Sequence, residues 1–127
     1  YIVFNHRQSV ETWSSAAIPF TDKNIYYDFT YPVSQAYGDN MKKVSESPER
    51  FGFYSGEITG SGANQDGYVD IFDNNDVFNS SQGGEFGYIK EDLNGDAFVD
   101  IFDMATVFNN MQNGAGMNTP PNPAKKK

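Results

Sequence analysis

The feature that most constrains this chain is an internal duplication in its second half. The segment DGYVDIFD, from Asp66 to Asp73, recurs thirty residues later as DAFVDIFD, from Asp96 to Asp103. The match continues beyond these segments, because a Val-Phe-Asn triplet follows each of them at the same offset. So close a repeat predicts two copies of one structural unit that pack against each other.

The second copy carries oxygen-bearing side chains at alternate positions. Counted from Asp92 as position 1, positions 1, 3, 5, 9 and 12 are Asp92, Asn94, Asp96, Asp100 and Asp103. A tight loop turns such side chains inward, and Ca²⁺ takes about six to eight hard oxygen ligands. Position 7, here Phe98, adds its backbone carbonyl. The spacing therefore predicts a calcium loop.

The first copy has the same pattern except at its start. Positions 3, 5, 7, 9 and 12 are Asn64, Asp66, Tyr68 through its carbonyl, Asp70 and Asp73. Simple counting places Gly62, which has no side-chain oxygen, at position 1. Two alternatives are open: residues 59–63 fold out as an insertion and Glu57 returns as the first ligand, or a water takes that place. The two copies together predict two bound calcium ions.

Two positions depart from the usual pattern of such loops. Position 6 normally holds Gly for a sharp turn, but the second copy has Ala97, which we expect to cost about 1 kcal/mol of strain. Position 12 is Asp in both copies rather than the Glu of helix–loop–helix calcium sensors.

Each loop should lead into a helix. We expect a helix that starts at Asp103, runs to about Asn110 and is capped by Asp100. Val107 and Phe108 should face inward on it. Val99, the apolar residue at position 8, should pair with the other loop in a short β contact.

The N-terminal half is typical of short β-strands. The apolar run Tyr1 to Phe4 predicts a strand buried on both faces. Alternating residues 24–31 predict a half-buried strand that Pro32 stops. Turns are expected at residues 38–40 and 47–48.

The expected fold class is α+β, with short N-terminal β-strands followed by two EF-hand-like calcium loop–helix repeats. We divide the chain into a β-strand segment over residues 1–54, a duplicated calcium-binding module over residues 55–112, and a flexible Pro/Asn/Lys tail over residues 113–127.

Composition excludes several classes of function. The 127 residues carry a formal net charge of −8, which should repel nucleic acid and anionic lipid. The absence of Cys and the single His rule out disulfides, thiolate metal sites and multi-histidine metal centres within one chain. No apolar run is long enough to span a bilayer. Since calcium ligation accounts for the carboxylates and no nucleophile motif is visible, we expect no enzymatic activity.

The repeats resemble those of dockerins, through the motif DLNGD, which begins at Asp92, and the motif VDIFD, which ends at Asp103. Residues 87–89 and the N-terminal run from Tyr1 to Ser14 further resemble dockerin-like modules that end large secreted proteins of Bacteroidota. The resemblance implies a secreted, extracellular or cell-surface, calcium-stabilised and non-catalytic module. In cellulosomal dockerins, positions 10 and 11 are often small hydroxyl residues that face the cohesin partner. Here these positions hold Ile-Phe pairs, so we expect one residue of each pair to pack in the core and the other to meet a neighbour.

The same resemblance implies that residue 1 lies inside a β-domain whose earlier strands are absent, so that another subunit completes or accepts the N-terminal strand. The expected assembly interface is Tyr1, Ile2, Val3, Phe4 and Trp13. The leading interpretation is a structural subunit that self-assembles into an extracellular filament, fibre or surface layer, with glycan decoration conceivable. The alternative is a dockerin-like binding module that anchors a larger secreted enzyme or adhesin to a partner.

Overall fold

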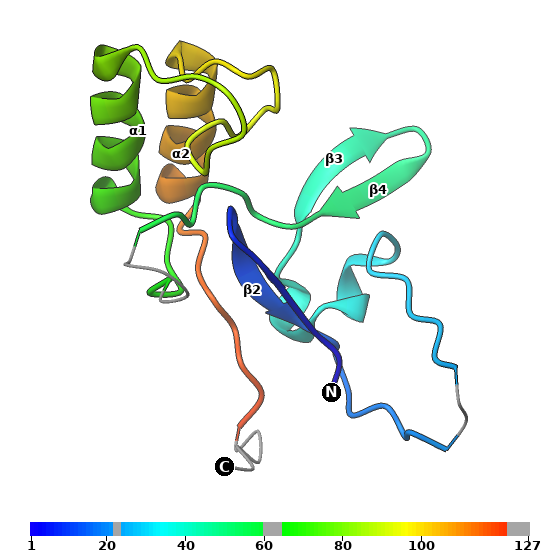
Figure 1. The fold of residues 1–127 in the computed structure, drawn as a ribbon. Coiled ribbons are helices and arrows are strands. Elements are labelled where there is room, and N and C mark those ends of the chain that lie inside the picture. Colours follow the sequence, from blue (N-terminus) through cyan, green and yellow to red (C-terminus); the bar gives the residue numbers. More distant parts are fainter. Residues whose placement is uncertain (22–23, 60–64, 122–127) are drawn as a thin grey trace. The chain divides into compact units, whose positions relative to one another are not determined.

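The computed structural model describes residues 1–21, 24–59 and 65–121 (Figure 1). Its elements, in chain order, are β1 (Val3–His6), β2 (Ser9–Trp13), the 3₁₀ turns η1 (Val33–Gln35) and η2 (Tyr37–Asp39), β3 (Lys42–Glu46), β4 (Glu49–Gly52), α1 (Ile71–Gly83) and α2 (Ile101–Gln112). Two sheets of two strands each, followed by two helices, make the chain broadly α+β, as expected.

The chain divides into two units. The first contains Tyr1–Phe4, Glu11–Phe53 and Met117–Lys127, and the second contains Asn5–Val10 and Tyr54–Gly116. The β1–β2 hairpin contributes its base to the first unit and its tip to the second. Both acidic repeats lie in the second unit, which therefore contains the candidate site.

In the first unit, β3 and β4 form an antiparallel hairpin around the expected turn at Ser47-Pro48. Lys43 holds this hairpin from one side, because its ammonium lies 2.8 Å from Glu46 and 2.9 Å from Glu49. The other expected turn, at residues 38–40, coincides with the end of η2.

The predicted strand over residues 24–31 is wrong. The segment alternates in exposure, but the described structure assigns it no strand. Tyr27 and Phe29 face inward because their rings pack together, with centroids 4.8 Å apart, and Phe29 also packs on Phe53 at 5.5 Å. Aromatic packing at every second residue therefore accounts for the alternation, although the carbonyl of Thr30 accepts a single hydrogen bond from the N–H of Phe51 on β4, at 3.0 Å.

The N-terminal strand exists but is shifted and exposed. β1 starts at Val3 rather than Tyr1, and none of its residues is buried. Val3 is 40% exposed and Tyr1, just before the strand, is 48% exposed. Ile2 is anchored to Ser14 by two hydrogen bonds, and the Tyr1 ring packs edge-on against Trp13. A strand buried on both faces is therefore not what this chain forms by itself.

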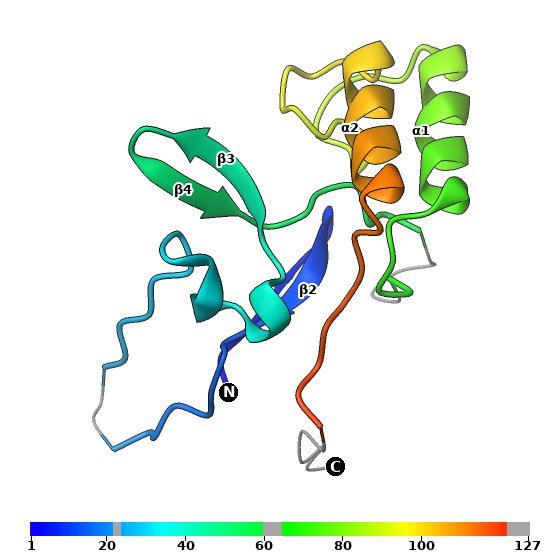
Figure 2. The same cartoon turned by 180° about the vertical axis from the view of Figure 1, so that it is seen from behind.

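The second unit places α1 and α2 side by side and antiparallel (Figures 1 and 2). Asp70 and Asp100 cap them, each accepting a hydrogen bond from the N–H two residues on, as expected for Asp100. Val77 and Val107 are 0% exposed and fill the space between the helices and the rest of the unit. Phe108 was expected inward but is 50% exposed, because it lies on the opposite side of α2 from the buried residues.

The expectation that one residue at loop positions 10 and 11 packs in the core of each repeat is also wrong, whereas a contact of these residues with a neighbour stays a prediction. All four residues of the two Ile-Phe pairs are exposed: Ile71 by 51%, Phe72 by 63%, Ile101 by 70% and Phe102 by 66%. They occupy the first turns of α1 and α2, where the capped helix start turns both side chains away from the core. Within the described residues, neither helix has the length and apolarity needed to cross a membrane.

Candidate metal centre in the duplicated loops

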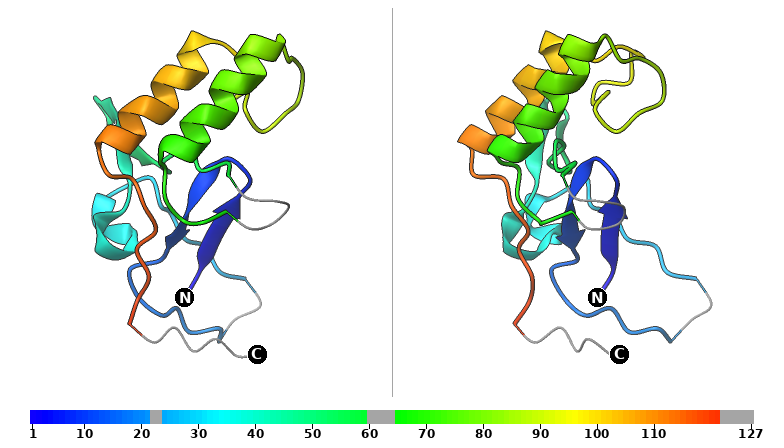
Figure 3. Two further views of the ribbon diagram at one scale, coloured as in Figure 1. Left: turned by 90° about the vertical axis from the view of Figure 1, so that its left-hand side faces the viewer. Right: turned by 60° about the vertical axis from the view of Figure 1, so that its left-hand side comes forward.

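Each acidic loop lies beside the segment that follows the helix of the other repeat, and a backbone hydrogen bond joins the two (Figure 3). The N–H of Val69 donates to the carbonyl of Ala115 at 2.9 Å, and the N–H of Val99 donates to the carbonyl of Glu85 at 3.4 Å. The prediction that Val99 pairs with the other loop is therefore wrong. Gly84 ends α1 at φ 67°, and this left-handed turn brings the following residues beside the opposite loop.

The last carboxylate of the second loop ties the two ends of that loop together. Asp103 is 0% exposed, and its Oδ1 accepts from the N–H groups of Leu93 and Asn94 at 2.8 and 3.1 Å. Its Oδ2 accepts from the N–H of Asp100 at 2.9 Å. Buried N–H groups need such partners, so this side chain closes the loop whether or not it also contacts a metal.

Asp73 makes the same set of contacts in the first loop. Its Oδ1 accepts from the N–H groups of Ile58 and Thr59, both at 2.8 Å, and its Oδ2 accepts from Asp70 at 2.8 Å. Glu57 therefore precedes Ile58 just as Asp92 precedes Leu93 in the other copy. By these contacts Glu57 corresponds in backbone position to Asp92. Residues 60–63 of the expected insertion lie outside the described residues, so the insertion stays a prediction.

The Glu57 side chain is the least satisfied polar group of the site. It is 0% exposed, and neither carboxylate oxygen accepts a hydrogen bond of normal geometry. Burial raises the pKa of Glu57 to about 8, and the charges of Asp73 and Asp66 add to the rise, although the nearby N–H of Gly67 opposes it. A buried carboxylate beside two others requires a proton or a cation.

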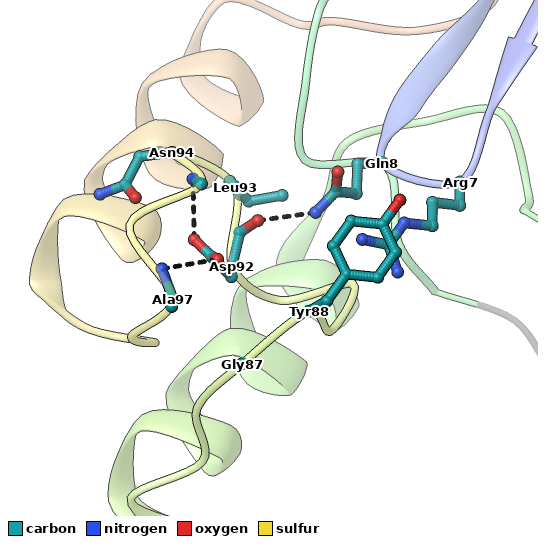
Figure 4. Close-up of a pocket in the computed structure, with 9 residues that line it drawn as sticks. Arg7, Gln8, Gly87, Tyr88, Asp92, Leu93, Asn94 and Ala97 are labelled. Atoms are coloured by element: carbon teal, nitrogen blue, oxygen red, sulfur yellow. Dashed lines mark hydrogen bonds between the residues drawn. The ribbon is translucent and has the colours of Figure 1, made fainter.

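The second loop is ordered around its own carboxylates (Figure 4). Asp92 accepts from the N–H of Gly95 through Oδ1 at 2.8 Å and from the N–H of Ala97 through Oδ2 at 2.9 Å. Asp96 accepts from the N–H of Phe98 at 2.9 Å, as Asp66 does from Tyr68 in the first loop. The backbone amides thus hold these side chains on the inner side of a tight turn.

Not every expected ligand is directed into a loop. The Oδ1 atoms of Asp70 and Asp100 cap the helices, and the side chain of Asn94 bonds the backbone and side chain of Asp96. Asn64 lies outside the described residues. In the described ranges, no three His, Asp or Glu side chains form a group arranged to hold a metal ion.

Gln8, at the tip of the β1–β2 hairpin, reaches the start of both loops. Its Nε2 donates to the carbonyl of Asp92 at 2.7 Å and to that of Lys90 at 3.1 Å (Figure 4). The backbone carbonyl of Gln8 accepts a hydrogen bond from the N–H of Gly56, the residue before Glu57, at 2.8 Å. Sequence reasoning missed Gln8, because no local spacing connects it to loops so distant along the chain.

A cavity of about 340 Å³ opens between this hairpin tip and the second loop. The guanidinium of Arg7 stacks on the ring of Tyr88, 3.9 Å from its centroid, at one side of the cavity (Figure 4). The stacked pair and Gln8 fix the hairpin tip against the chain that leads to Asp92.

Comparison of the chain with protein-family models, with curated proteins and with solved structures finds no match. The chemistry of the site therefore rests on its own residues. Its donors are carboxylate, amide and carbonyl oxygens, and the two oxygens of Glu57 are buried without a hydrogen-bond partner. Hard oxygen donors of this kind fit Ca²⁺.

We predict that Ala97→Gly stabilises the chain by about 1 kcal/mol, because Ala97 has φ 73° where the first loop has Gly67 at φ 93°. Denaturant unfolding in chelator measures the change. The matched control is Ala105→Gly, an exposed site in the interior of α2, which should lose about 1 kcal/mol. Equal losses in both variants would contradict strain at position 97.

We also predict opposite effects for Glu57→Gln with and without calcium. In chelator at pH 8, the variant should be more stable than the parent chain by about 1–3 kcal/mol, since a buried charge is removed. In millimolar calcium, it should gain less stability than the parent chain does. Calcium-dependent thermal melts of both proteins decide this, and an equal calcium gain would remove Glu57 from the ligand set.

Proposed function

We propose that this chain is a secreted, calcium-stabilised structural subunit that self-assembles through its N-terminal strand into an extracellular filament, fibre or surface layer. The observation that carries the proposal is the buried, unpartnered carboxylate of Glu57 in a loop that is hydrogen-bonded to the β1–β2 hairpin through Gln8. Calcium would satisfy that carboxylate, and the hairpin would carry the assembly strand.

Two calcium ions are proposed, one in each loop. The first would be held by Glu57, Asn64, Asp66, the carbonyl of Tyr68, Asp70 and Asp73. The second would be held by Asp92, Asn94, Asp96, the carbonyl of Phe98, Asp100 and Asp103. Calcium would supply positive charge to carboxylates that otherwise repel one another. Its role would be stability rather than signalling, because extracellular modules bind Ca²⁺ at about 10⁻⁴ to 10⁻³ M and stay filled outside the cell.

Assembly through the N-terminal strand is supported by the incomplete covering of β1 within a single chain. The sheet that contains β1 has two strands, and no third strand joins it within the described residues. Val3 on β1 and Tyr1 before it are 40% and 48% exposed. A strand from a second subunit would cover this apolar edge with main-chain hydrogen bonds. Repeated head to tail, such a contact produces an open filament.

A docking module is the second candidate. The observation that favours it is the exposure of all four residues at loop positions 10 and 11, which leaves an apolar surface at the starts of both helices. A chain of this kind would stay monomeric and would anchor a larger secreted enzyme or adhesin to a partner protein.

We predict that chelation lowers the melting temperature by about 5–15 °C, because calcium binds the folded chain and not the unfolded one. The variant Asp66→Asn with Asp96→Asn should lose most of this difference. Both side chains are exposed and keep their accepting oxygens, so its melt in chelator should match that of the parent chain. Asp39→Asn, at an exposed site in the first unit, is the control and should keep the full difference.

We predict that Val3→Lys abolishes large assemblies in millimolar calcium, since a charge on the strand edge opposes strand addition. Light scattering gives the particle mass before and after chelation. Val44 lies on β3 and is 63% exposed, so Val44→Lys is the matched control and should assemble like the parent chain. Unchanged assembly of Val3→Lys would refute the strand model, and a monomeric parent chain would favour the docking module.

A further inference from the structure

The outward side of the helix pair carries an unusual amount of apolar surface. Ile71 and Phe78 on α1 are 51% and 45% exposed, and their repeat equivalents Ile101 and Phe108 on α2 are 70% and 50% exposed. We call these four residues the helix-pair patch. Seven residues separate the members of each pair, so each pair lies on one side of its helix, away from the buried valines.

The α2 half of the helix-pair patch borders a groove between the two helices. The groove has a volume of about 220 Å³ and is lined by Asn74 of α1 together with Ile101, Met104, Ala105 and Phe108 of α2. Phe72 and Phe102 are also exposed, but each lies about a quarter turn further around its helix and is not part of the patch. With about half of each large side chain exposed, the four residues present roughly 400 Å² of apolar surface. A standard interface takes about 800 Å² from each partner, so the patch could supply about half of one.

The helix-pair patch itself contains no charged residue, and the acidic residues next to it are the helix caps Asp70 and Asp100. The helices contain three acidic residues, and Asp73 and Asp103 are 0% exposed. The third, Asp76, lies 3.2 Å from the ammonium of Lys90. In a chain with a formal net charge of −8, this is a surface on which like-charged copies can approach with little repulsion.

The duplication gives the helix-pair patch an internal symmetry. Ile71 and Phe78 on one helix correspond to Ile101 and Phe108 on the other, and the helices are antiparallel (Figure 2). A two-fold dimer needs one patch that is complementary to itself, and a patch built twice from the same residues presents the same features to a rotated copy.

We propose that the helix-pair patch is a self-association surface that binds the same patch of a second copy of this chain. This contact is separate from the N-terminal strand and goes beyond the proposed function. A subunit with both contacts could join laterally as well as head to tail, as a layer or a thick fibre requires.

The experiment uses the full chain carrying Val3→Lys, so that strand-mediated assembly is suppressed. Sedimentation equilibrium in millimolar calcium, up to about 100 μM chain, should show a monomer–dimer equilibrium. Adding Ile71→Glu with Ile101→Glu should weaken the dimer by at least about tenfold. Both positions start a helix, where an acidic residue favours helix formation, so these variants should fold.

Two further variants keep the test decisive. Phe78→Ser with Phe108→Ser should also weaken the dimer, and it adds no charge near the loops. Phe20→Glu with Tyr26→Glu is the control, because these side chains are 82% and 90% exposed in the first unit, and its dimer should persist. A monomer at every concentration overturns the proposal, as does a dimer that both patch variants leave unchanged.

The failures of the two proposals differ. A parent chain that forms nothing larger than a dimer, which both patch variants dissociate, would refute the strand model and retain the patch. Large assemblies of the parent chain with monomers of the Val3→Lys chain would retain the strand model and refute the patch. A monomer that binds a different purified protein through Phe72 and Phe102 would also refute self-association.

Discussion

The second unit depends on one repeated interaction, the burial of an aspartate that gathers three backbone N–H groups. Asp73 and Asp103 each join the start of an acidic loop to the first turn of the helix that follows it. Without these carboxylates, three backbone N–H groups in each loop would lose their partners. The cost is greatest for the buried N–H of Ile58, at about 1–3 kcal/mol. The other features of the site, including the position of Glu57, follow from this closure.

Local sequence patterns correctly predicted the features that depend only on a few neighbouring residues. The two helices, the Asp100 cap and the left-handed residue at Ala97 each depend on a few adjacent residues, and the structure has all of them. Contacts between distant segments were beyond such patterns. Val99 meets the chain after α1 rather than the other loop, and no spacing pointed to Gln8. The false strand over residues 24–31 has the same origin, since aromatic packing and a strand face produce the same alternation.

The two loops differ in how well backbone N–H groups compensate the negative charge of the carboxylate at position 1. In the second loop, Asp92 receives two backbone N–H groups and its charge is partly compensated. In the first loop, Glu57 occupies the equivalent backbone position, its carboxylate accepts no hydrogen bond of normal geometry, and burial raises its pKa to about 8. The first loop therefore has the stronger need for a proton or a cation, although its sequence is the less typical of the two.

Calcium and association are linked through charge as well as through structure. Two Ca²⁺ ions would halve the formal net charge of −8, and self-repulsion between copies falls as the net charge falls. The same ions would stiffen both loops, and Gln8 bonds the hairpin tip to each of them. On the proposed function, an acidic chain would remain dispersed while calcium is scarce and would associate once calcium has both neutralised its loops and ordered its hairpin.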